Sequence, residues 1–324
     1  MKRLDGLAWV PRATSHMGCL EGCVRRLGIQ MSPGWLYGGT GHAFFINVDE
    51  DLCPSGPHSW PYFHVVPKLG KNLGLQVDVH ATHKSHKDFA ERQEAIWGAV
   101  RGAIDRGFPC YGWHYEFIVI AGYDETAYLL SGPMDAPRGW REFGASSAPG
   151  FVEIAVVRRR EAAQDRTVAK DALTFATQLA KSREGRADWG GFAAYDKWVK
   201  GLESGGEISS DGSGYHAAIW AECRGFAVEF LQEAGRRLGD GGGELFERAA
   251  GHYAQVRDSL QAVARLFPFP DAATPEARRK EMLEQLKGYA TDQPRRKEAA
   301  GHVREARGAE GAAVVVLEQI TKSL

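Results

Sequence analysis

The spacing of hydrophobic positions changes near residue 160 and divides the chain into two parts. Before this point, short apolar runs alternate with Gly- and Pro-rich turns, which is typical of strands mixed with a few helices. After it, apolar residues recur every three or four positions with few interruptions, which predicts helices. We therefore expect an α+β domain over residues 1–160 and an all-helical domain over residues 161–324.

The first part is predicted to contain two amphipathic helices and several short strands. One helix begins near Thr14 or Ser15, either of which can act as N-cap, and ends at about Leu27 before Gly28. The other covers residues 87–106. Strands are expected at residues 43–48, 77–80, 117–121, 127–131 and 151–157. Residues 53–61 are expected to form a loop, because three prolines and a glycine cannot hold a helix.

The second part is predicted to be a series of helices separated by glycine or proline. Gly-rich segments at 204–214 and 239–243, and a Pro-rich segment at 268–275, mark breaks between them. The helices are expected at residues 163–183, 189–203, 214–238, 243–266, 275–290 and 295–322.

Composition narrows the class of protein. The chain has 324 residues, of which 44% are hydrophobic and 25% charged, and its formal net charge is −1. Near-neutral charge argues against nucleic acid or an anionic membrane as partner. No apolar run approaches the roughly 20 residues of a membrane span, and no secretory signal is visible. Five irregularly spaced cysteines do not suggest a disulfide framework, so we expect a cytoplasmic protein.

Residues 107–125 are the most informative segment. They read Gly-Phe-Pro-Cys-Tyr-Gly-Trp-His-Tyr-Glu-Phe-Ile-Val-Ile-Ala-Gly-Tyr-Asp-Glu. A Gly-x-Pro turn leads into polar residues flanked by aromatic ones, and an apolar run and a Gly-Tyr-Asp turn follow. This order predicts a strand that brings polar groups to one end, with His114 and Glu116 on the same face if that strand is extended.

This segment resembles the histidine-bearing strand of papain-fold cysteine enzymes, such as the bacteriocin-processing peptidases and the N-terminal domain of butirosin biosynthesis protein H. Residues 35–60, with Gly-Thr-Gly-His-Ala-Phe and Cys-Pro-Ser-Gly-Pro, look more like the butirosin-type branch. The resemblance covers about residues 10–155 and implies a papain-like fold for the first domain. The helical part looks like the helical extensions that often follow this domain.

The resemblance also implies a function. It suggests cysteine-dependent acyl transfer or amide processing in bacterial specialised metabolism. The substrate would be a small molecule or a peptide, which a carrier protein could present, because the butirosin-type branch is linked to acyl transfer from a thioester carrier.

The spacing of the family motifs places other residue types at the catalytic positions. In the simplest register Ser15 stands where the peptidases have the catalytic cysteine, and Cys19 falls on a second, non-catalytic cysteine. Glu116 stands at the histidine position. The aspartate of an Asp-Pro pair corresponds to Gly132.

A catalytic site could be rebuilt from neighbouring residues. Cys19 lies near the start of the first helix, where the helix dipole lowers a thiol pKa, so it is the candidate nucleophile; plain packing is the alternative. The candidate base is His114 or His42, and the candidate residue to orient it is Glu116 or Asp124. Backbone N–H groups near the helix start could form an oxyanion hole.

Further residues are candidates for substrate binding. Gly41 ends a glycine-rich turn that could form an anion-binding nest or simply be a tight entry to a strand. Tyr215 and His216 follow a Gly-Ser stretch and could form a lid. The full set of candidate substrate-binding residues is Ser15, Gly41, Tyr123, Tyr215 and His216.

No motif predicts a metal or a cofactor. His80, His83 and His86 have the spacing of a helical metal site, but the surrounding residues favour an exposed helix start capped by Ser85. No phosphate-binding glycine motif occurs.

Two functions therefore compete. The enzyme hypothesis is favoured by the polar and aromatic residues around 110–116. The alternative is a non-catalytic descendant of the fold that binds a small molecule or peptide in a cleft between the domains, and the altered catalytic positions favour it. The sequence leaves the oligomeric state open.

Overall fold

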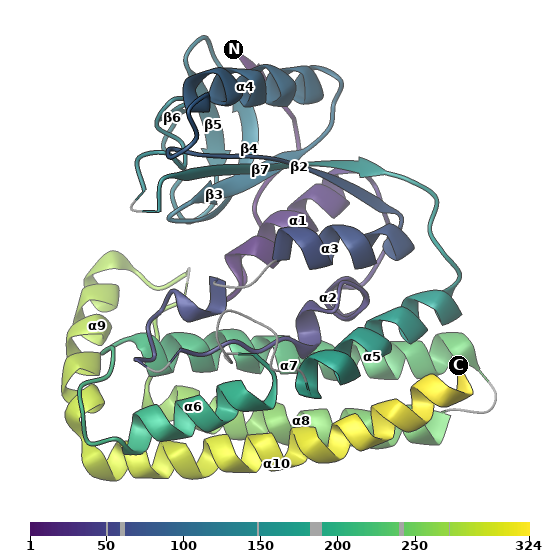
Figure 1. The fold of residues 1–324 in the computed structure, drawn as a ribbon, viewed down its shortest axis with the longest axis vertical. Coiled ribbons are helices and arrows are strands. Elements are labelled where there is room, and N and C mark those ends of the chain that lie inside the picture. The colour runs from purple at the N-terminus through teal and green to yellow at the C-terminus, as the bar shows by residue number, and fades with distance from the viewer. Residues whose placement is uncertain (50, 59–61, 148, 182–189, 240–242, 272) are drawn as a thin grey trace. The chain divides into compact units, whose positions relative to one another are not determined.

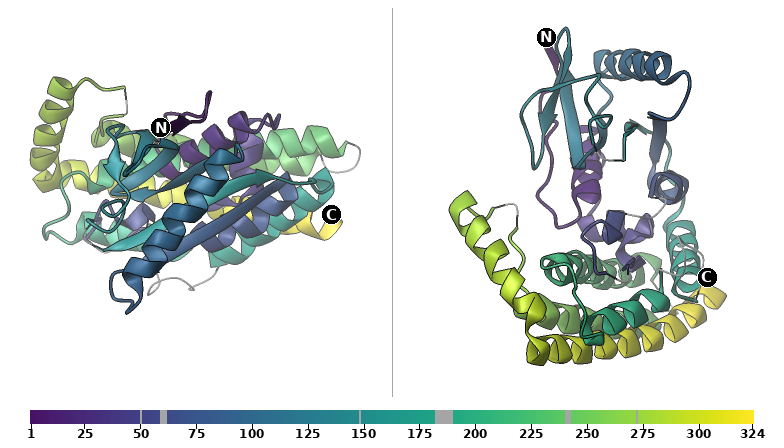
Figure 2. Two further views of the ribbon diagram at one scale, coloured as in Figure 1. Left: turned by 90° about the horizontal axis from the view of Figure 1, so that it is seen from above. Right: turned by 60° about the vertical axis from the view of Figure 1, so that its left-hand side comes forward.

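The computed structural model describes residues 1–49, 51–58, 62–147, 149–181, 190–239, 243–271 and 273–324 (Figures 1 and 2). It contains helices and an antiparallel sheet, which confirms the α+β class. Backbone contacts group the chain into two compact units. The sheet unit comprises Met1–Ser32 and Leu73–Ala162, and the helical unit comprises Pro33–Asn72 and Ala163–Leu324. The helical unit thus takes in residues 33–72, which the sequence analysis assigned to the first domain.

The sheet unit is built on one antiparallel sheet. The strand order is β2-β7-β3-β4-β5-β6, and β1 pairs with β4. The strands are β1 (Lys2–Arg3), β2 (Leu75–His83), β3 (Cys110–His114), β4 (Glu116–Tyr123), β5 (Ala127–Ser131), β6 (Arg138–Gly139) and β7 (Phe151–Arg159). Helix α1 (Ser15–Arg26) lies on one face and helix α4 (Phe89–Asp105) on the other (Figure 1). The predicted strands from 77 onward are confirmed; β5 has the expected bounds, and β2, β4 and β7 are longer than expected.

Helix α1 begins and ends where the sequence predicts. Thr14 is the N-cap residue in extended conformation, and its carbonyl accepts from the Gly18 N–H. At the other end Gly28 has a φ of 65°, and the Gly28 and Ile29 N–H groups return to the carbonyls of Arg25 and Val24. This is the way a left-handed glycine terminates a helix. Most of the helix is buried.

The segment around His114 differs from the prediction. Residues 110–114 form a separate strand, β3, which turns back into β4 at Tyr115, whose φ is 66°. The expectation that His114 and Glu116 follow each other along one strand is wrong, because they are paired across the β3–β4 hairpin. The single-residue turn places Glu116 at the very start of β4.

Two local predictions are also wrong, and one helix was not predicted. Residues 43–48 form no strand; a 3₁₀ turn, His42–Phe44, begins after Gly41, and an arginine takes the carbonyls that a neighbouring strand would use. Helix α3 (Tyr62–Gly70) follows the predicted loop 53–61, of which residues 59–61 lie outside the described residues. Ser85 caps no helix, because α4 begins at Phe89 after Asp88.

The helical unit confirms the helices predicted after residue 160. Residues 182–189, which include two predicted helix ends, lie outside the described residues. Helices α7, α8 and α10 pack along one another, and no helix among the described residues is long and apolar enough to cross a membrane. The helices are α2 (Pro33–Gly39), α3, α5 (Asp165–Lys181), α6 (Phe192–Glu203), α7 (Gly212–Leu238), α8 (Gly243–Leu266), α9 (Glu276–Thr291) and α10 (Gln293–Ser323).

A buried ion pair joins four segments of the helical unit. The Arg224 guanidinium on α7 lies 2.8 Å from a Glu310 carboxylate oxygen on α10, and the two side chains are 0% and 3% exposed. The Tyr195 hydroxyl of α6 also donates to Glu310. Arg224 donates to the carbonyls of Ala43 and Phe45. Burial by itself lowers the pKa of Arg224, but Glu310, followed by Tyr195 and Tyr253, more than offsets this, so Arg224 remains charged.

Breaking this pair on one side should destabilise the protein strongly. Arg224→Met leaves the Glu310 carboxylate buried without its cation, and we expect a loss of about 3–5 kcal/mol in the free energy of unfolding, measured by urea denaturation. The control is Arg304→Met, which removes an exposed pair with Glu203 and should cost about 0–1 kcal/mol. Equal effects of the two substitutions would contradict the assignment.

Stability should also depend on the protonation of Glu153 on β7. Burial raises the pKa of this half-buried carboxyl from its ordinary value of 4.5 to about 7. The folded state therefore holds a proton that the unfolded chain releases, so the stabilisation is complete below pH 4.5 and is lost as pH rises towards 7. We expect Glu153→Gln to remove this part of the pH dependence and to raise the melting temperature at pH 8. An unchanged difference between variant and wild type from pH 5 to pH 8 would contradict it.

Candidate functional site

A hydroxyl and a carboxylate meet at the start of helix α1. Ser15 is the first residue of α1 and Glu116 the first residue of β4. The Ser15 Oγ donates to the Glu116 Oε2 at 2.6 Å and accepts from the Phe117 backbone N–H at 3.3 Å. The Ser15 residue is 4% exposed. The structure thus brings together the two residues that the motif spacing assigned to the catalytic cysteine and histidine positions.

Local backbone conformation explains why these groups meet. The positive φ of Tyr115 closes the hairpin in a single residue, and this directs Glu116 back towards the α1 N-terminus. Unpaired N–H groups and the dipole at a helix N-terminus favour a negative charge there. Glu116 thus lies beside the α1 N-terminus, where its carboxyl group accepts from the Ser15 hydroxyl.

Aromatic side chains enclose the inner side of the pair. The buried His16 Nε2 lies 3.1 Å from the Tyr111 hydroxyl, and the His16 ring meets the Phe117 ring edge-on with centroids 4.7 Å apart. The Trp9 indole N–H donates to the Ser15 carbonyl at 3.3 Å. Because these contacts hold the backbone on both sides of Ser15, the hydroxyl has a fixed position. Neither His16 nor Tyr111 was a candidate residue from the sequence. The aromatic residues around Tyr111 are evident there, but nothing in the sequence indicates that His16 packs against them.

Cys19 has no feature of an activated thiol. It lies one turn inside α1 and is fully buried. Burial raises its pKa well above the ordinary value, and the neighbouring Cys23 and the Glu116 carboxylate raise it further. All three causes oppose the thiolate that a nucleophile needs. The geometry therefore favours the packing interpretation of Cys19.

His114 is fixed by a loop of the sheet unit. Its Nδ1 accepts from the Gly144 N–H at 3.0 Å, and its ring stacks on Phe143 with centroids 5.4 Å apart. Burial, followed by the nearby Arg138, lowers its pKa, so the ring is neutral at pH 7. Since Nδ1 accepts this bond, the proton is assigned to Nε2. The nitrogen that a general base would use is already engaged.

Tyr123 and Asp124 lie far from the Ser15–Glu116 pair. Tyr123 is the last residue of β4, about 23 Å along the strand from Glu116, and Asp124 follows it. The Asp124 Oδ1 accepts from the backbone N–H groups of Thr126 and Ala127, and these bonds lower its pKa. Asp124 therefore stabilises the β4–β5 turn. The Tyr123 hydroxyl donates to Asp105 on α4 at 2.7 Å.

His42 and Gly41 belong to the helical unit. The buried His42 Nδ1 lies 3.5 Å from the Cys223 sulfur. At Gly41, with a φ of 78°, an added Cβ would lie 2.5 Å from Phe175 and 2.9 Å from Leu69. Side chains therefore fill the space around this turn, which favours a packed turn over an anion-binding nest.

Tyr215 and His216 are buried near the start of α7. The His216 Nδ1 accepts from the Trp220 indole at 3.3 Å, and its Nε2 lies 3.2 Å from the Cys53 carbonyl. Tyr215 packs on Phe269 with ring centroids 5.0 Å apart. These contacts make both residues part of the core, which does not favour a lid.

The histidine triplet belongs to a strand and the turn after it. His80 and His83 lie on β2, and His86 lies in the turn before α4. The His83 Nδ1 contacts Ser85 at 2.7 Å, and its Nε2 contacts the Pro149 carbonyl at 2.8 Å. Among the residues that the structure describes, no group of three His, Cys, Asp or Glu side chains is arranged to hold a metal ion.

Comparison with known proteins adds no identification. No model of a protein family matches this chain, and no curated protein is significantly similar to it.

Thiol labelling can test this description of the cysteines. Cys53 is the half-exposed thiol, whereas Cys19, Cys23, Cys110 and Cys223 are buried. We expect iodoacetamide at pH 7 to label Cys53 first in the folded protein, with the site identified by peptide mass spectrometry. Cys53→Ser should abolish the early labelling, and Cys19→Ala should leave it unchanged. Early labelling that depends on Cys19 would instead support a thiol enzyme.

Proposed function

We propose that this protein is a non-catalytic descendant of the papain-like fold that binds a small molecule or a peptide without transforming it. The observation that carries the proposal is the 2.6 Å hydrogen bond from Ser15 to Glu116. By the resemblance, these two residues stand where the catalytic cysteine and histidine would be. A hydroxyl and a carboxylate thus replace a thiol and an imidazole.

This replacement removes the chemistry of a cysteine enzyme. Such an enzyme needs a thiol that ionises near neutral pH and a base whose pKa lies near the working pH. A serine hydroxyl is far less acidic than a thiol. Carboxylates are weaker bases than imidazoles by about 2 pKa units in model peptides. The stable form of the pair is therefore a hydrogen bond to a carboxylate, which contributes about 1.5–3 kcal/mol to stability.

The neighbouring residues do not supply a substitute. The Cys19 thiol is held neutral by its burial, and the His114 acceptor nitrogen is bonded to Gly144. The residues of the rebuilt triad are each used to hold the fold. This supports binding over thiol-dependent acyl transfer.

One observation favours a second candidate function. The Ser15 Oγ donates to a carboxylate and accepts a backbone N–H at the N-terminus of a helix. This is also an arrangement in which a serine nucleophile has a base beside it and N–H groups for a developing oxyanion. The second candidate is therefore acyl transfer or amide processing with Ser15 as nucleophile.

A fluorophosphonate probe separates the two functions. We expect no covalent labelling of Ser15 at pH 8, as judged by intact mass and peptide mapping, and the same result for Ser15→Ala. Stoichiometric labelling of wild type that is lost in both Ser15→Ala and Glu116→Gln would favour the serine enzyme.

A paired substitution tests the papain-like assignment itself. The double variant S15C/E116H restores the residue types of the family at the two positions. We expect its new thiol to react with iodoacetamide at pH 6–7 at least tenfold faster than that of the single variant S15C, because an imidazole stabilises the thiolate. Equal rates in the two variants would contradict the assignment.

A further inference from the structure

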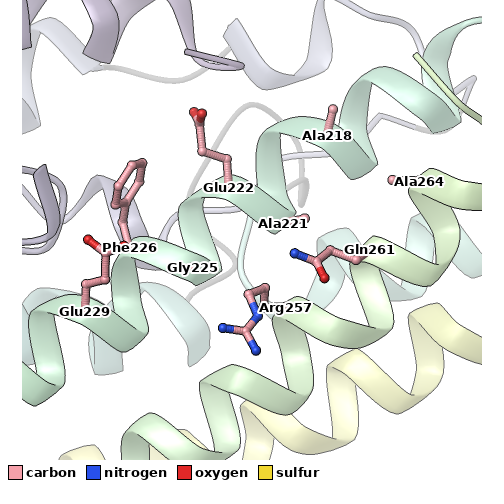
Figure 3. A pocket seen from close by; sticks show the side chains of 9 residues that line it. All are labelled: Ala218, Ala221, Glu222, Gly225, Phe226, Glu229, Arg257, Gln261 and Ala264. Atoms are coloured by element: carbon pink, nitrogen blue, oxygen red, sulfur yellow. The ribbon is translucent and has the colours of Figure 1, made fainter. Parts of the chain in front are cut away.

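Helices α7 and α8 form a pocket within the helical unit. Its volume is about 390 Å³, and both walls belong to the same compact unit (Figure 3). The pocket exists because Ala218, Ala221 and Gly225 leave little side-chain volume on α7. The residues that line it are Ala218, Ala221, Glu222, Gly225, Phe226, Glu229, Arg257, Gln261 and Ala264.

The two walls of this pocket carry opposite charge. Helix α7 contributes Glu222 and Glu229, which lie two turns or about 10 Å apart along the helix, with Phe226 between them. Helix α8 contributes Arg257 and Gln261, one turn apart. Figure 3 shows the two acidic side chains and the Phe226 ring extending from α7, and Arg257 and Gln261 extending from α8.

Glu222 and Arg257 each have a neighbour outside the pocket lining. A Glu222 oxygen lies 3.4 Å from the Tyr37 hydroxyl of α2, and the Arg257 guanidinium lies 2.8 Å from the adjacent Asp258. The Arg257 side chain is 33% exposed and the Asp258 side chain 62%. An exposed pair of this kind is worth little, so a ligand carboxylate could replace Asp258 at small cost.

We propose that this pocket binds an amino-acid-type zwitterion with a large apolar side chain. Its ammonium group would pair with the acidic wall, where Phe226 adds a cation–π contact, and its carboxylate would pair with Arg257. The apolar side chain would lie on Ala218, Ala221 and Ala264. This inference rests on the binding role proposed above and assigns its ligand class.

Charge and size exclude simpler ligand classes. A dicarboxylate or a phosphate would face Glu222 and Glu229, and a polyamine would face Arg257. A ligand that carries both signs is complementary to both walls. The volume lies at the low end of small-molecule pockets, about 300–1,000 Å³, which suits one large amino acid or a dipeptide.

Calorimetric titration of the full chain tests the ligand class. The probes are L-phenylalanine and the dipeptide L-phenylalanyl-L-leucine. We expect at least one of them to bind with 1:1 stoichiometry. Removing its negative charge as the methyl ester, or its positive charge by N-acetylation, should weaken binding at least tenfold. Arg257→Gln should weaken the zwitterion at least tenfold and change the ester little.

A glycine pair tests the position of the site. A Cβ added at Gly225 would lie 3.7 Å from the Arg257 Cδ, which is ordinary contact, so Gly225→Leu should fold and fill the pocket. At Gly251 on α8, away from the pocket, a Cβ meets nothing within 4 Å, so Gly251→Leu is the matched control. We expect Gly225→Leu to abolish binding and Gly251→Leu to preserve it, with equal helicity by circular dichroism.

Two results would overturn this inference. One is the absence of binding by both probes at 10 mM, well above the roughly millimolar affinity of a weak ligand. The other is binding that Gly225→Leu leaves unchanged. Neither result bears on the fluorophosphonate experiment, in which we expect Ser15 to remain unlabelled, so the two proposals can fail separately. Conversely, labelling of Ser15 in a protein that still binds the probe would contradict the non-catalytic role alone.

Discussion

The hydrogen bond between Ser15 and Glu116 is the interaction on which the arrangement of the sheet unit depends. It connects the first residue of α1 to the first residue of β4, which are 101 positions apart in the chain. The left-handed Tyr115 makes it possible, because a longer turn would displace the carboxylate from the helix start. Once the bond is formed, α1 has a fixed position against the β3–β4 hairpin, and the thiols of α1 are enclosed. Burial, followed by Cys23 and Glu116, raises the pKa of Cys19 well above its ordinary value.

In the helical unit, a buried ion pair connects segments that are distant in the chain. Arg224 and Glu310 join α7 to α10, and the remaining donors of the guanidinium satisfy the carbonyls of Ala43 and Phe45. An irregular segment can be buried only if its backbone groups find partners, so this arginine replaces the missing strand neighbour. Such a pair adds little net stability compared with apolar packing, but it penalises every arrangement that separates the charges. It thus favours one packing of the long helices over alternatives.

Sequence periodicity predicted the parts of this fold that depend on local patterns. The helices after residue 160 and α1 follow from the recurrence of apolar residues and from glycine or proline stops. Residues 43–48 were mispredicted because an apolar run does not reveal that a distant arginine will hold its carbonyls. Strand β3 was missed because a turn at a tyrosine carries no glycine signal. The same limit applies to the site. Motif spacing pointed to Ser15 and Glu116 as the counterparts of the family's cysteine and histidine. Their contact, and the burial that raises the pKa of Cys19, depend on the folded chain.

The two units differ in how their polar side chains are used. A catalytic site must keep a reactive group accessible and its base unoccupied. In the sheet unit the candidate groups are bonded to backbone or to each other, as Ser15, His114 and Asp124 illustrate. A binding site needs space between groups of suitable charge, and the α7–α8 pocket supplies space between a wall with Glu222 and Glu229 and a wall with Arg257. The candidate groups of the sheet unit thus make hydrogen bonds that stabilise the fold. The polar groups that line the pocket face a volume that a ligand could fill. A charged ligand gains affinity from groups of opposite charge along a volume it can occupy, so recognition is more consistent with this pocket of the helical unit than with the Ser15–Glu116 pair.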